Sequence, residues 1–347
     1  PQVDRQTIIG KGKLQELVQK ADAHEADLII FNHELTPRQS QLITDAVGLP
    51  VIDRVQLILD IFAMRARSKE GKLQVELAQL EYLLPRLVGQ GKTLSRLGGG
   101  IGTRGPGETK LETDRRHIRN KIFAVKKELK EVEAHRERNR QKRKNSEIFQ
   151  IGLIGYTNAG KSTILNLLTQ ADTYSKDQLF ATLDPLTKRW RFAEGFEITV
   201  TDTVGFIQDL PTQLIDAFHS TLEEVKFANL LLEVVDYSDE HYMEHMEVTR
   251  QTLKELGADE IPCIHVFNKC DIAKANGRED VPVELPHIGK DCIYMAAGQN
   301  IGLEELVQLI SNYIYQDYVE CTMLIPYTEG ALVSYFNENA TVKETEY

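Results

Sequence analysis

The stretch from Ile148 to Gln170 constrains the fold of this 347-residue chain more than any other. It consists of a mostly apolar run, IFQIGLI, a loop of glycines and small residues, GYTNAGKST, and a run with helical periodicity, TILNLLTQ. A buried strand that leads through such a loop into a helix is typical of parallel sheets covered by helices. We therefore predict an α/β domain over residues 147–318.

The loop also has the spacing G-x-x-x-x-G-K-[ST]. Glycines let backbone N–H groups approach phosphates, Lys161 adds a positive charge, and the hydroxyl of Ser162 can ligate magnesium. The pattern predicts a nucleotide-binding phosphate loop in a Ras-like P-loop domain. We expect its nucleotide contacts to come from Gly155, Tyr156, Thr157, Asn158, Ala159, Gly160, Lys161, Ser162 and Thr163.

Two later motifs complete a phosphate and metal site. The strand EITVTDTVGF ends at Asp202 and Gly205, a D-x-x-G pattern that places a carboxylate beside Mg²⁺ and a glycine N–H near a γ-phosphate. In FATLD, the hydroxyl of Thr182 is expected to join the magnesium shell when a γ-phosphate is bound. We predict Lys161, Thr182 and Gly205 as the catalytic residues and Ser162, Thr182 and Asp202 as the metal ligands.

The residues expected to recognise the base of the nucleotide lie further along the chain. The strand PCIHVF ends in Asn268, Lys269 and Asp271, and Asp271 can accept two hydrogen bonds from guanine, which adenine cannot donate in that pattern. The strand DCIYMAAG ends in Ala296 and Ala297, where a backbone N–H is expected to meet the base oxygen. The sequence therefore predicts GTP and GDP as ligands.

Two residues bear on the hydrolysis rate. Phe206 follows Gly205, where Ras-like enzymes use a glutamine to orient the attacking water, so we expect slow hydrolysis in isolation and stimulation by a partner. Asn158 is a candidate ligand for K⁺, and the alternative that it only hydrogen-bonds its own loop is equally open.

The N-terminal half is predicted as two parts. Over residues 1–70, alternating helix and strand patterns indicate a small α/β unit, with Thr36 capping one helix. Over residues 71–146, apolar residues recur at spacings of three and four on both sides of a glycine-rich segment, which predicts a long antiparallel helical hairpin with a tip loop at 89–108. Pro85 should end or kink its first helix. Residues 319–347 begin like a strand and a helix and form a short or partial C-terminal element.

Charge is distributed unevenly along the chain. Residues 113–145 hold 13 Lys and Arg against 5 Asp and Glu, a net charge of +8 in a chain with a net charge of −11. This arm and its tip can contact the phosphates of a nucleic acid, although a solvated charged face is the alternative. The candidate RNA-binding residues are Arg96, Arg104, Lys110, Arg115 and Arg116.

Several functions are not indicated. No stretch of 18 apolar residues or secretory signal pattern is present, so we expect a cytoplasmic protein without a membrane span, peripheral to membranes at most through a partner. Four cysteines without C-x-x-C spacing predict reduced thiols and no structural zinc site. The segment HYMEH at 241–245 fits an H-x-x-E-H zinc pattern, but lacks a third ligand and is predicted to be surface.

The segments GGGIGTRGPGETKLETDRR, GYTNAGKST, LFATLDP, DTVGFI and NKCD together resemble the HflX family of translational GTPases within the Obg-HflX group, over nearly the whole chain. The resemblance implies a monomer that binds the large (50S) ribosomal subunit and its rRNA. It also implies that the GTP form splits stalled 70S ribosomes under stress, with the hairpin loop near the peptidyl transferase region. Ala296 departs from the usual serine.

Two other functions remain open at this point. A signalling switch could use the hairpin to bind a protein helix rather than RNA, and its binding would then be insensitive to salt. An ATP-driven RNA remodeller would need a second phosphate loop in the N-terminal part, where the sequence shows none.

Overall fold

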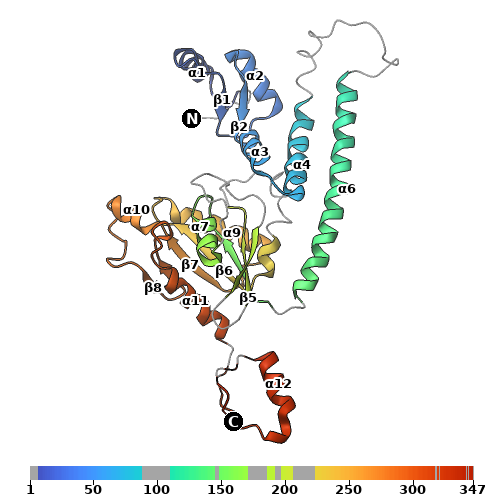
Figure 1. Cartoon of the computed structure of the whole chain (residues 1–347). Helices are drawn as coiled ribbons and strands as arrows, with labels where there is room; N and C mark the ends of the chain where they lie inside the picture. The colour runs from blue at the N-terminus through green and yellow to red at the C-terminus, as the bar shows by residue number, and fades with distance from the viewer. Residues whose placement is uncertain are drawn as a thin grey trace.

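The computed structural model describes residues 7–87, 110–144, 148–170, 186–191, 197–205, 223–316, 319, 321–340, 342 and 344–346. Figure 1 shows three regions in chain order: a small α/β unit, a pair of long helices, and a larger domain built on a central sheet. The predicted α/β fold class, with a helical hairpin before a P-loop domain, is confirmed. The exact division at residues 70, 146 and 318 stays a prediction.

The N-terminal unit consists of α1 (Lys11–Ala23), β1 (Ile29–Phe31), α2 (Pro37–Val47), β2 (Val51–Asp53) and α3 (Arg54–Arg65). The two strands are parallel, with Ile29 opposite Val51. Thr36 caps α2 as the sequence predicted: its hydroxyl accepts from the N–H of Gln39, while the Gln39 side chain accepts from the N–H of Thr36. This reciprocal capping fixes where the helix begins.

Asp53 joins this unit to the first long helix, α4 (Lys69–Arg86). Its carboxylate is buried and accepts from the N–H of Leu35 at 3.0 Å and from the hydroxyl of Tyr82 at 2.8 Å. The guanidinium of Arg86 lies 3.2 Å from the same carboxylate. A buried carboxylate is stable only when such donors surround it, so this cluster fixes α4 against the N-terminal unit.

The long helices α4 and α6 (Lys110–Lys144) lie side by side and antiparallel (Figure 1). Their seam contains the apolar residues that the sequence spacing predicted: Leu73, Leu77, Leu80, Val125 and Leu129 are buried, and Ile118, Ile122 and Val132 pack against them. Ion pairs flank the seam at Lys121–Glu76 and Lys126–Glu81, both 2.8 Å. Helix α4 ends one residue after Pro85, and the predicted tip loop lies outside the described residues.

The large domain contains a seven-stranded sheet in the order β4-β5-β3-β6-β7-β9-β8. All neighbours are parallel except the two edge pairs, β4–β5 and β8–β9. The strands are β3 (Gln150–Ile154), β4 (Leu186–Arg191), β5 (Glu197–Asp202), β6 (Leu230–Asp236), β7 (Cys263–Asn268), β8 (His287–Gly289) and β9 (Cys292–Tyr294).

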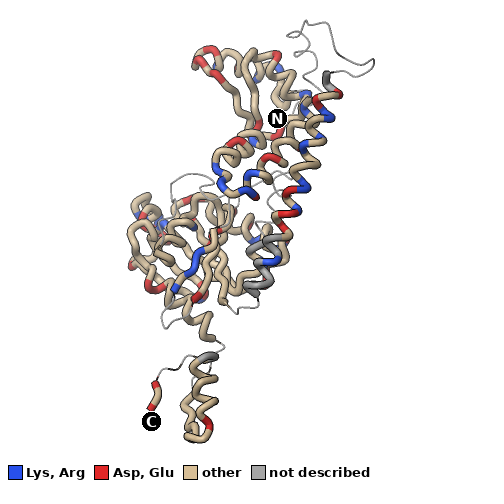
Figure 2. Tube along the Cα trace, turned by 45° about the vertical axis from the view of Figure 1, so that its right-hand side comes forward, with Lys and Arg blue, Asp and Glu red and all other residues tan. Residues whose placement is uncertain are grey.

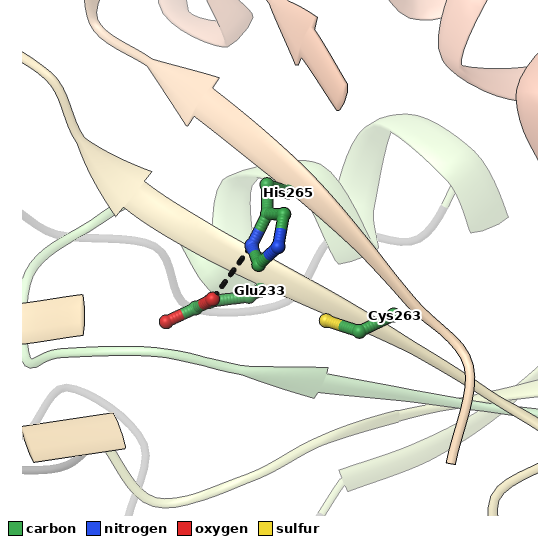
Figure 3. A group of neighbouring side chains, drawn as sticks. All are labelled: Glu233, Cys263 and His265. Carbon is green, nitrogen blue, oxygen red and sulfur yellow. Dashed lines mark hydrogen bonds and ion pairs between the residues drawn. The ribbon is translucent and has the colours of Figure 1, made fainter. Parts of the chain in front are cut away.

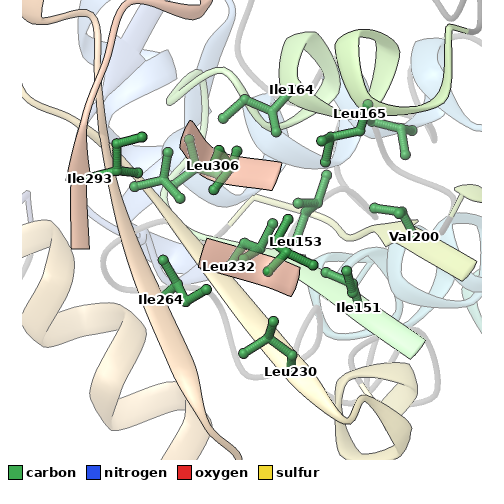
Figure 4. Packing of buried hydrophobic residues seen from close by; sticks show 14 of the residues in the cluster. Ile151, Leu153, Ile164, Leu165, Val200, Leu230, Leu232, Ile264, Ile293 and Leu306 are labelled. Atoms are coloured by element: carbon green, nitrogen blue, oxygen red, sulfur yellow. The ribbon is translucent and has the colours of Figure 1, made fainter. Parts of the chain in front are cut away.

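Helices cover both faces of this sheet. On one face, α7 (Lys161–Thr169) and α11 (Leu303–Tyr315) pack on the main core, in which residues such as Leu153, Leu232 and Ile264 are completely buried (Figure 4). On the other face, α9 (Tyr242–Leu256) packs against a smaller apolar cluster. Because helices cover both faces of the sheet, a ligand is expected to bind at the carboxyl ends of the parallel strands. Shorter helices are η2 (Glu223–Phe227), α10 (Cys270–Ala275) and η3 (Ala297–Gln299).

The C-terminal element corrects one expectation. Residues 321–326, read as the start of a strand, have no regular secondary structure, and Leu324 is completely exposed. A strand needs a partner edge to satisfy its backbone, and no strand among the described residues is paired with this segment. A helical element does follow, as η4 (Tyr327–Glu329) and α12 (Gly330–Asn339). Among the residues described, no helix is both long and apolar enough to cross a membrane.

The Asp53 cluster yields a stability prediction. We expect Asp53→Ala to lower the free energy of unfolding of the N-terminal half by about 3 kcal/mol, because it leaves the Tyr82 hydroxyl and the Leu35 N–H without their acceptor and removes the ion-pair partner of the half-buried Arg86. Tyr82→Phe removes only one of these hydrogen bonds and should cost about 1 kcal/mol. Hydrogen exchange of α3 and α4 in the full chain measures both effects, and equal effects of the two variants would contradict this role for Asp53.

Candidate nucleotide-binding site

The predicted phosphate loop connects β3 to α7 at the carboxyl end of the sheet. Gly155 has a φ of 132°, and a Cβ there would strike the backbone carbonyl of Val234 on the neighbouring strand. Gly160 has a φ of 104°, and a Cβ there would strike the side-chain amide of Asn268. Both positions therefore require glycine for conformation and for space, so the loop backbone can lie as close to phosphate oxygens as the motif demands.

Lys161 is buried at the centre of this loop, with 6% of its surface exposed. Its ammonium group donates to the backbone carbonyls of Gly155 at 3.1 Å and Tyr156 at 2.8 Å. Burial lowers the pKa of Lys161 to about 8, and the negative charge of Asp202 opposes that shift. A buried ammonium group held by carbonyl oxygens is a ready partner for a phosphate, whose negative charge would raise that pKa again.

The predicted magnesium ligands of the described chain lie together. The hydroxyl of Ser162, in the first turn of α7, donates to a carboxylate oxygen of Asp202 at the end of β5 over 2.7 Å. Gly205 packs against the phosphate loop, since a Cβ there would lie 2.8 Å from the Cα of Thr157. Two separate strands thus bring a hydroxyl, a carboxylate and a glycine N–H to one place. Thr182 lies outside the described residues.

Asn268 joins the base side of the site to the phosphate loop. Its buried side chain donates to the backbone carbonyl of Ala159 at 2.9 Å and accepts from the backbone N–H of Ala297 at 2.9 Å. The N–H of Ala297, expected to meet the base, is therefore directed at Asn268 here. Ala296 is buried and its N–H bonds the carbonyl of Ile301. Direct contact of either alanine with the base stays a prediction.

Lys269 and Asp271, also in the NKCD segment, lie close to Asn268 in the sequence. Lys269 has a positive φ of 62° and its ammonium group bonds the carboxylate of Asp236, at the end of β6, over 2.7 Å. Asp271 is half-buried in the first turn of α10, and its contact with a base stays a prediction.

Sequence reasoning missed one contact of the loop. The ring of Tyr156 stacks on His245 of α9, with centroids 3.7 Å apart and planes 10° from parallel. His245 belongs to the HYMEH segment, in which His241 is exposed and pairs with Glu244 at 3.4 Å. Among the described residues, the one candidate group of metal ligands does not include this segment. Nothing in the spacing of the sequence pairs Tyr156 with a helix almost ninety residues away.

The candidate RNA-binding residues are only partly described. Arg116 is exposed near the start of α6, whereas Arg115 is half-buried and its Nε has no hydrogen-bond partner in the structure. Lys110 is the first residue of α6, and Arg96 and Arg104 lie outside the described residues. Asn158, the candidate K⁺ ligand, has a positive φ of 64° within the phosphate loop.

Known proteins resemble this chain along almost its full length. Three family models match consecutive segments: GTP-binding GTPase N-terminal at 1–63, GTP-binding GTPase Middle Region at 65–143, and 50S ribosome-binding GTPase at 150–269. The GTPase HflX of Caldanaerobacter subterraneus subsp. tengcongensis is 49% identical over 345 residues, which are 99% of this chain and 78% of that protein. The GTPase HflX of Escherichia coli is 42% identical, over 97% and 79% of the two chains.

This chain belongs to the HflX family of GTPases. The crystal structure of the SsGBP and GDP complex agrees with that family, with a TM-score of 0.50, 26% identity, and coverage of 91% of this chain and 89% of the other. An HflX GTPase binds and hydrolyses GTP. That the buried lysine, the glycine turns and the Ser162–Asp202 pair form its nucleotide site stays a prediction from the sequence motifs.

The low pKa of Lys161 predicts a pH dependence of GDP binding. Below about pH 8 the free protein already carries the charged lysine, whereas above it phosphate binding must take up a proton. GDP affinity should therefore fall by up to tenfold per pH unit above about pH 8. Calorimetry from about pH 6.5 to about pH 9 in two buffers of different ionisation enthalpy measures the uptake. Lys161→Met should abolish it and Lys254→Met should not; uptake that persists in Lys161→Met would contradict the assignment.

Proposed function

We propose that this HflX GTPase binds the large ribosomal subunit and, in its GTP form, separates stalled 70S ribosomes into subunits under stress. The observation that carries the proposal is one chain that combines a GTP site with a long helix of net positive charge. The family model matched over 150–269 is that of a 50S ribosome-binding GTPase. Figure 2 shows basic and acidic residues interspersed along α6.

The basic residues of α6 divide into two groups. Lys121 and Lys126 pair with glutamates of α4 and hold the hairpin together. Arg119, Lys127 and Lys130 are exposed, so their charges are available to rRNA phosphates, and Arg116, which is also exposed, is a predicted RNA-binding residue. Through this division the hairpin stabilises itself with one set of cations and contacts RNA with the other.

The site fits Mg²⁺ with GTP or GDP. The glycine turns leave space that a Cβ would fill, the charge of Lys161 suits a phosphate, and a hydroxyl and a carboxylate are the oxygen ligands that Mg²⁺ prefers. Ser162, Asp202 and Thr182 would hold the ion, which neutralises charge on the β- and γ-phosphates. Asn158 is the proposed K⁺ ligand. Asp271 would accept from the guanine base.

The chain's own residues then account for a slow enzyme. Lys161 stabilises the charge that develops on the phosphates, and the N–H of Gly205 orients the γ-phosphate. Phe206 has no polar group with which to orient the attacking water. We infer that hydrolysis is slow in the isolated chain and that the ribosome stimulates it. We also infer a monomer that acts in the cytoplasm, where ribosomes are found.

Base selection by Asp271 gives the next prediction. Asp271→Asn should weaken GDP and GTP binding about 100-fold or more, because an amide presents a donor to a guanine donor. The same variant should gain affinity for xanthine nucleotides, which carry an acceptor at that position. Asp259→Asn, at an exposed position, is the matched control. Unchanged guanine affinity in Asp271→Asn would contradict the role, and fluorescence titration with labelled nucleotides measures it.

Ribosome sedimentation tests the proposed function. Purified 70S ribosomes with this protein and a non-hydrolysable GTP analogue should convert to subunits, and with GDP they should not. Deletion of residues 98–107 should abolish splitting, and the pair Arg116→Glu and Arg119→Glu should weaken binding while Lys11→Glu, on exposed α1, should not. Ribosomes that stay intact without bound protein would contradict the proposal, and salt-insensitive binding would favour a protein partner.

A further inference from the structure

A second cluster of ligand-type side chains lies in the sheet, away from the strand ends. Glu233 of β6 and Cys263 and His265 of β7 each offer one ligand atom, and these three atoms lie within 4.8 Å of one another (Figure 3). Among the described residues, no other three His, Cys, Asp or Glu side chains form such a group. The nucleotide site uses none of them.

Strand register explains why these three meet. Glu233 is directly opposite His265 in the parallel pairing of β6 and β7, so both side chains point to the same face. Cys263 precedes His265 by two residues and shares that face. The intervening Ile264 points to the opposite side and is completely buried in the main core. The backbone thus fixes the cluster, and small side-chain rotations suffice to adjust it.

A simpler explanation covers two of the three residues. The side chain of Glu233 is 7% exposed, and a buried carboxylate needs a donor. Nδ1 of His265 lies 2.8 Å from its carboxylate, which satisfies that need. This His265–Glu233 contact does not explain the thiol of Cys263. Its sulfur points toward the pair in Figure 3, and its hydrogen-bond contact to the carbonyl of Ile264 is long at 3.9 Å.

We propose that Glu233, Cys263 and His265 form a zinc site. One thiolate, one imidazole nitrogen and one carboxylate oxygen form a mixed donor set suited to Zn²⁺, whereas Mg²⁺ and Ca²⁺ prefer oxygen alone. The thiolate and the carboxylate carry two negative charges, which one Zn²⁺ neutralises in this largely buried setting. Ligand atoms around tetrahedral zinc lie about 3.5 Å apart. On zinc binding, the distance between the imidazole nitrogen and the carboxylate oxygen would therefore increase slightly, and the sulfur would move toward both atoms.

The fourth coordination position is accessible. The side chain of His265 is 41% exposed, so water can complete the shell. Cys292 of β9 is the other possible fourth ligand, because it is paired in register with His265 and its side chain shares the same face. Three protein ligands with one open position is an arrangement that zinc accepts.

Such an ion would join two strands that end in the nucleotide site. Glu233 is three residues before Asp236, the partner of Lys269, and His265 is three residues before Asn268. An ion across β6 and β7 would therefore stabilise the frame of the guanine pocket without contacting the nucleotide. The expected effect is structural: a higher melting temperature with zinc, and little change in GDP affinity.

Metal analysis of the full chain tests the proposal. The protein is stripped with a chelator, exposed to Zn²⁺ and dialysed, and zinc is measured by mass spectrometry. About one zinc per chain is expected for the wild type and for Cys321→Ser, whose cysteine is exposed and distant in sequence. Cys263→Ser and His265→Asn should lose it. A wild type that retains no zinc, or a Cys263→Ser protein that retains as much, would overturn the proposal.

A second measurement has its main readout in the wild type, so that readout does not depend on whether the variants fold. Addition of Co²⁺ to the stripped wild type should give a thiolate-to-cobalt charge-transfer band, which appears only if a cysteine sulfur binds the metal. The band should vanish in Cys263→Ser, persist in Cys321→Ser, and weaken in Cys292→Ser only if that residue is the fourth ligand. Retained GDP binding shows that each variant is folded. Absence of the band in the wild type would overturn the proposal.

Discussion

The nucleotide site depends on the side chain of Asn268. Its amide donates to the phosphate loop at Ala159 and accepts from the loop at Ala297, so three segments distant in sequence meet at one buried group. The glycine at position 160 exists partly to leave room for it, since a Cβ there would strike that amide. A buried amide with both of its functions satisfied by backbone groups is rigid, and it holds the loops in position before any ligand binds.

The nucleotide site is also connected to the rest of the molecule through the strands that lead into it. Asn268 ends β7, the phosphate loop follows β3, and β3 begins shortly after α6 ends at Lys144. The hairpin is held by an apolar seam and interhelical ion pairs, and it meets the N-terminal unit through the buried carboxylate of Asp53. A change at the nucleotide therefore has a short covalent route to the arm that we propose contacts the ribosome.

The sequence predicted the elements whose signals are local. The phosphate loop, the apolar seam of the hairpin and the cap at Thr36 depend on spacings within one segment, and the structure places each of them as expected. Interactions between segments that are distant in sequence could not be predicted from the sequence alone. The hydrogen bond from Ala297 to Asn268, the stack of Tyr156 on His245 and the group formed by Glu233 with β7 all depend on strand order and register.

The C-terminal error has the same origin. The run at 321–326 has the apolar composition of a strand, but composition cannot say whether an edge is available to pair with it. The predicted roles of Arg96, Arg104 and Thr182 depend on segments outside the described residues, and they remain predictions from the family resemblance and the motif.

The central claim is that Asn268 holds the segments of the nucleotide site together. The most direct test is to measure the affinity of Asn268→Ala for GDP and for inorganic triphosphate, beside that of Asp271→Ala. If Asn268 holds the phosphate loop in position, its loss should weaken both ligands, by about tenfold or more. Asp271→Ala should weaken GDP binding and leave triphosphate binding unchanged, because we propose that this carboxylate contacts only the base. An Asn268→Ala protein that binds triphosphate as tightly as the wild type would contradict the account.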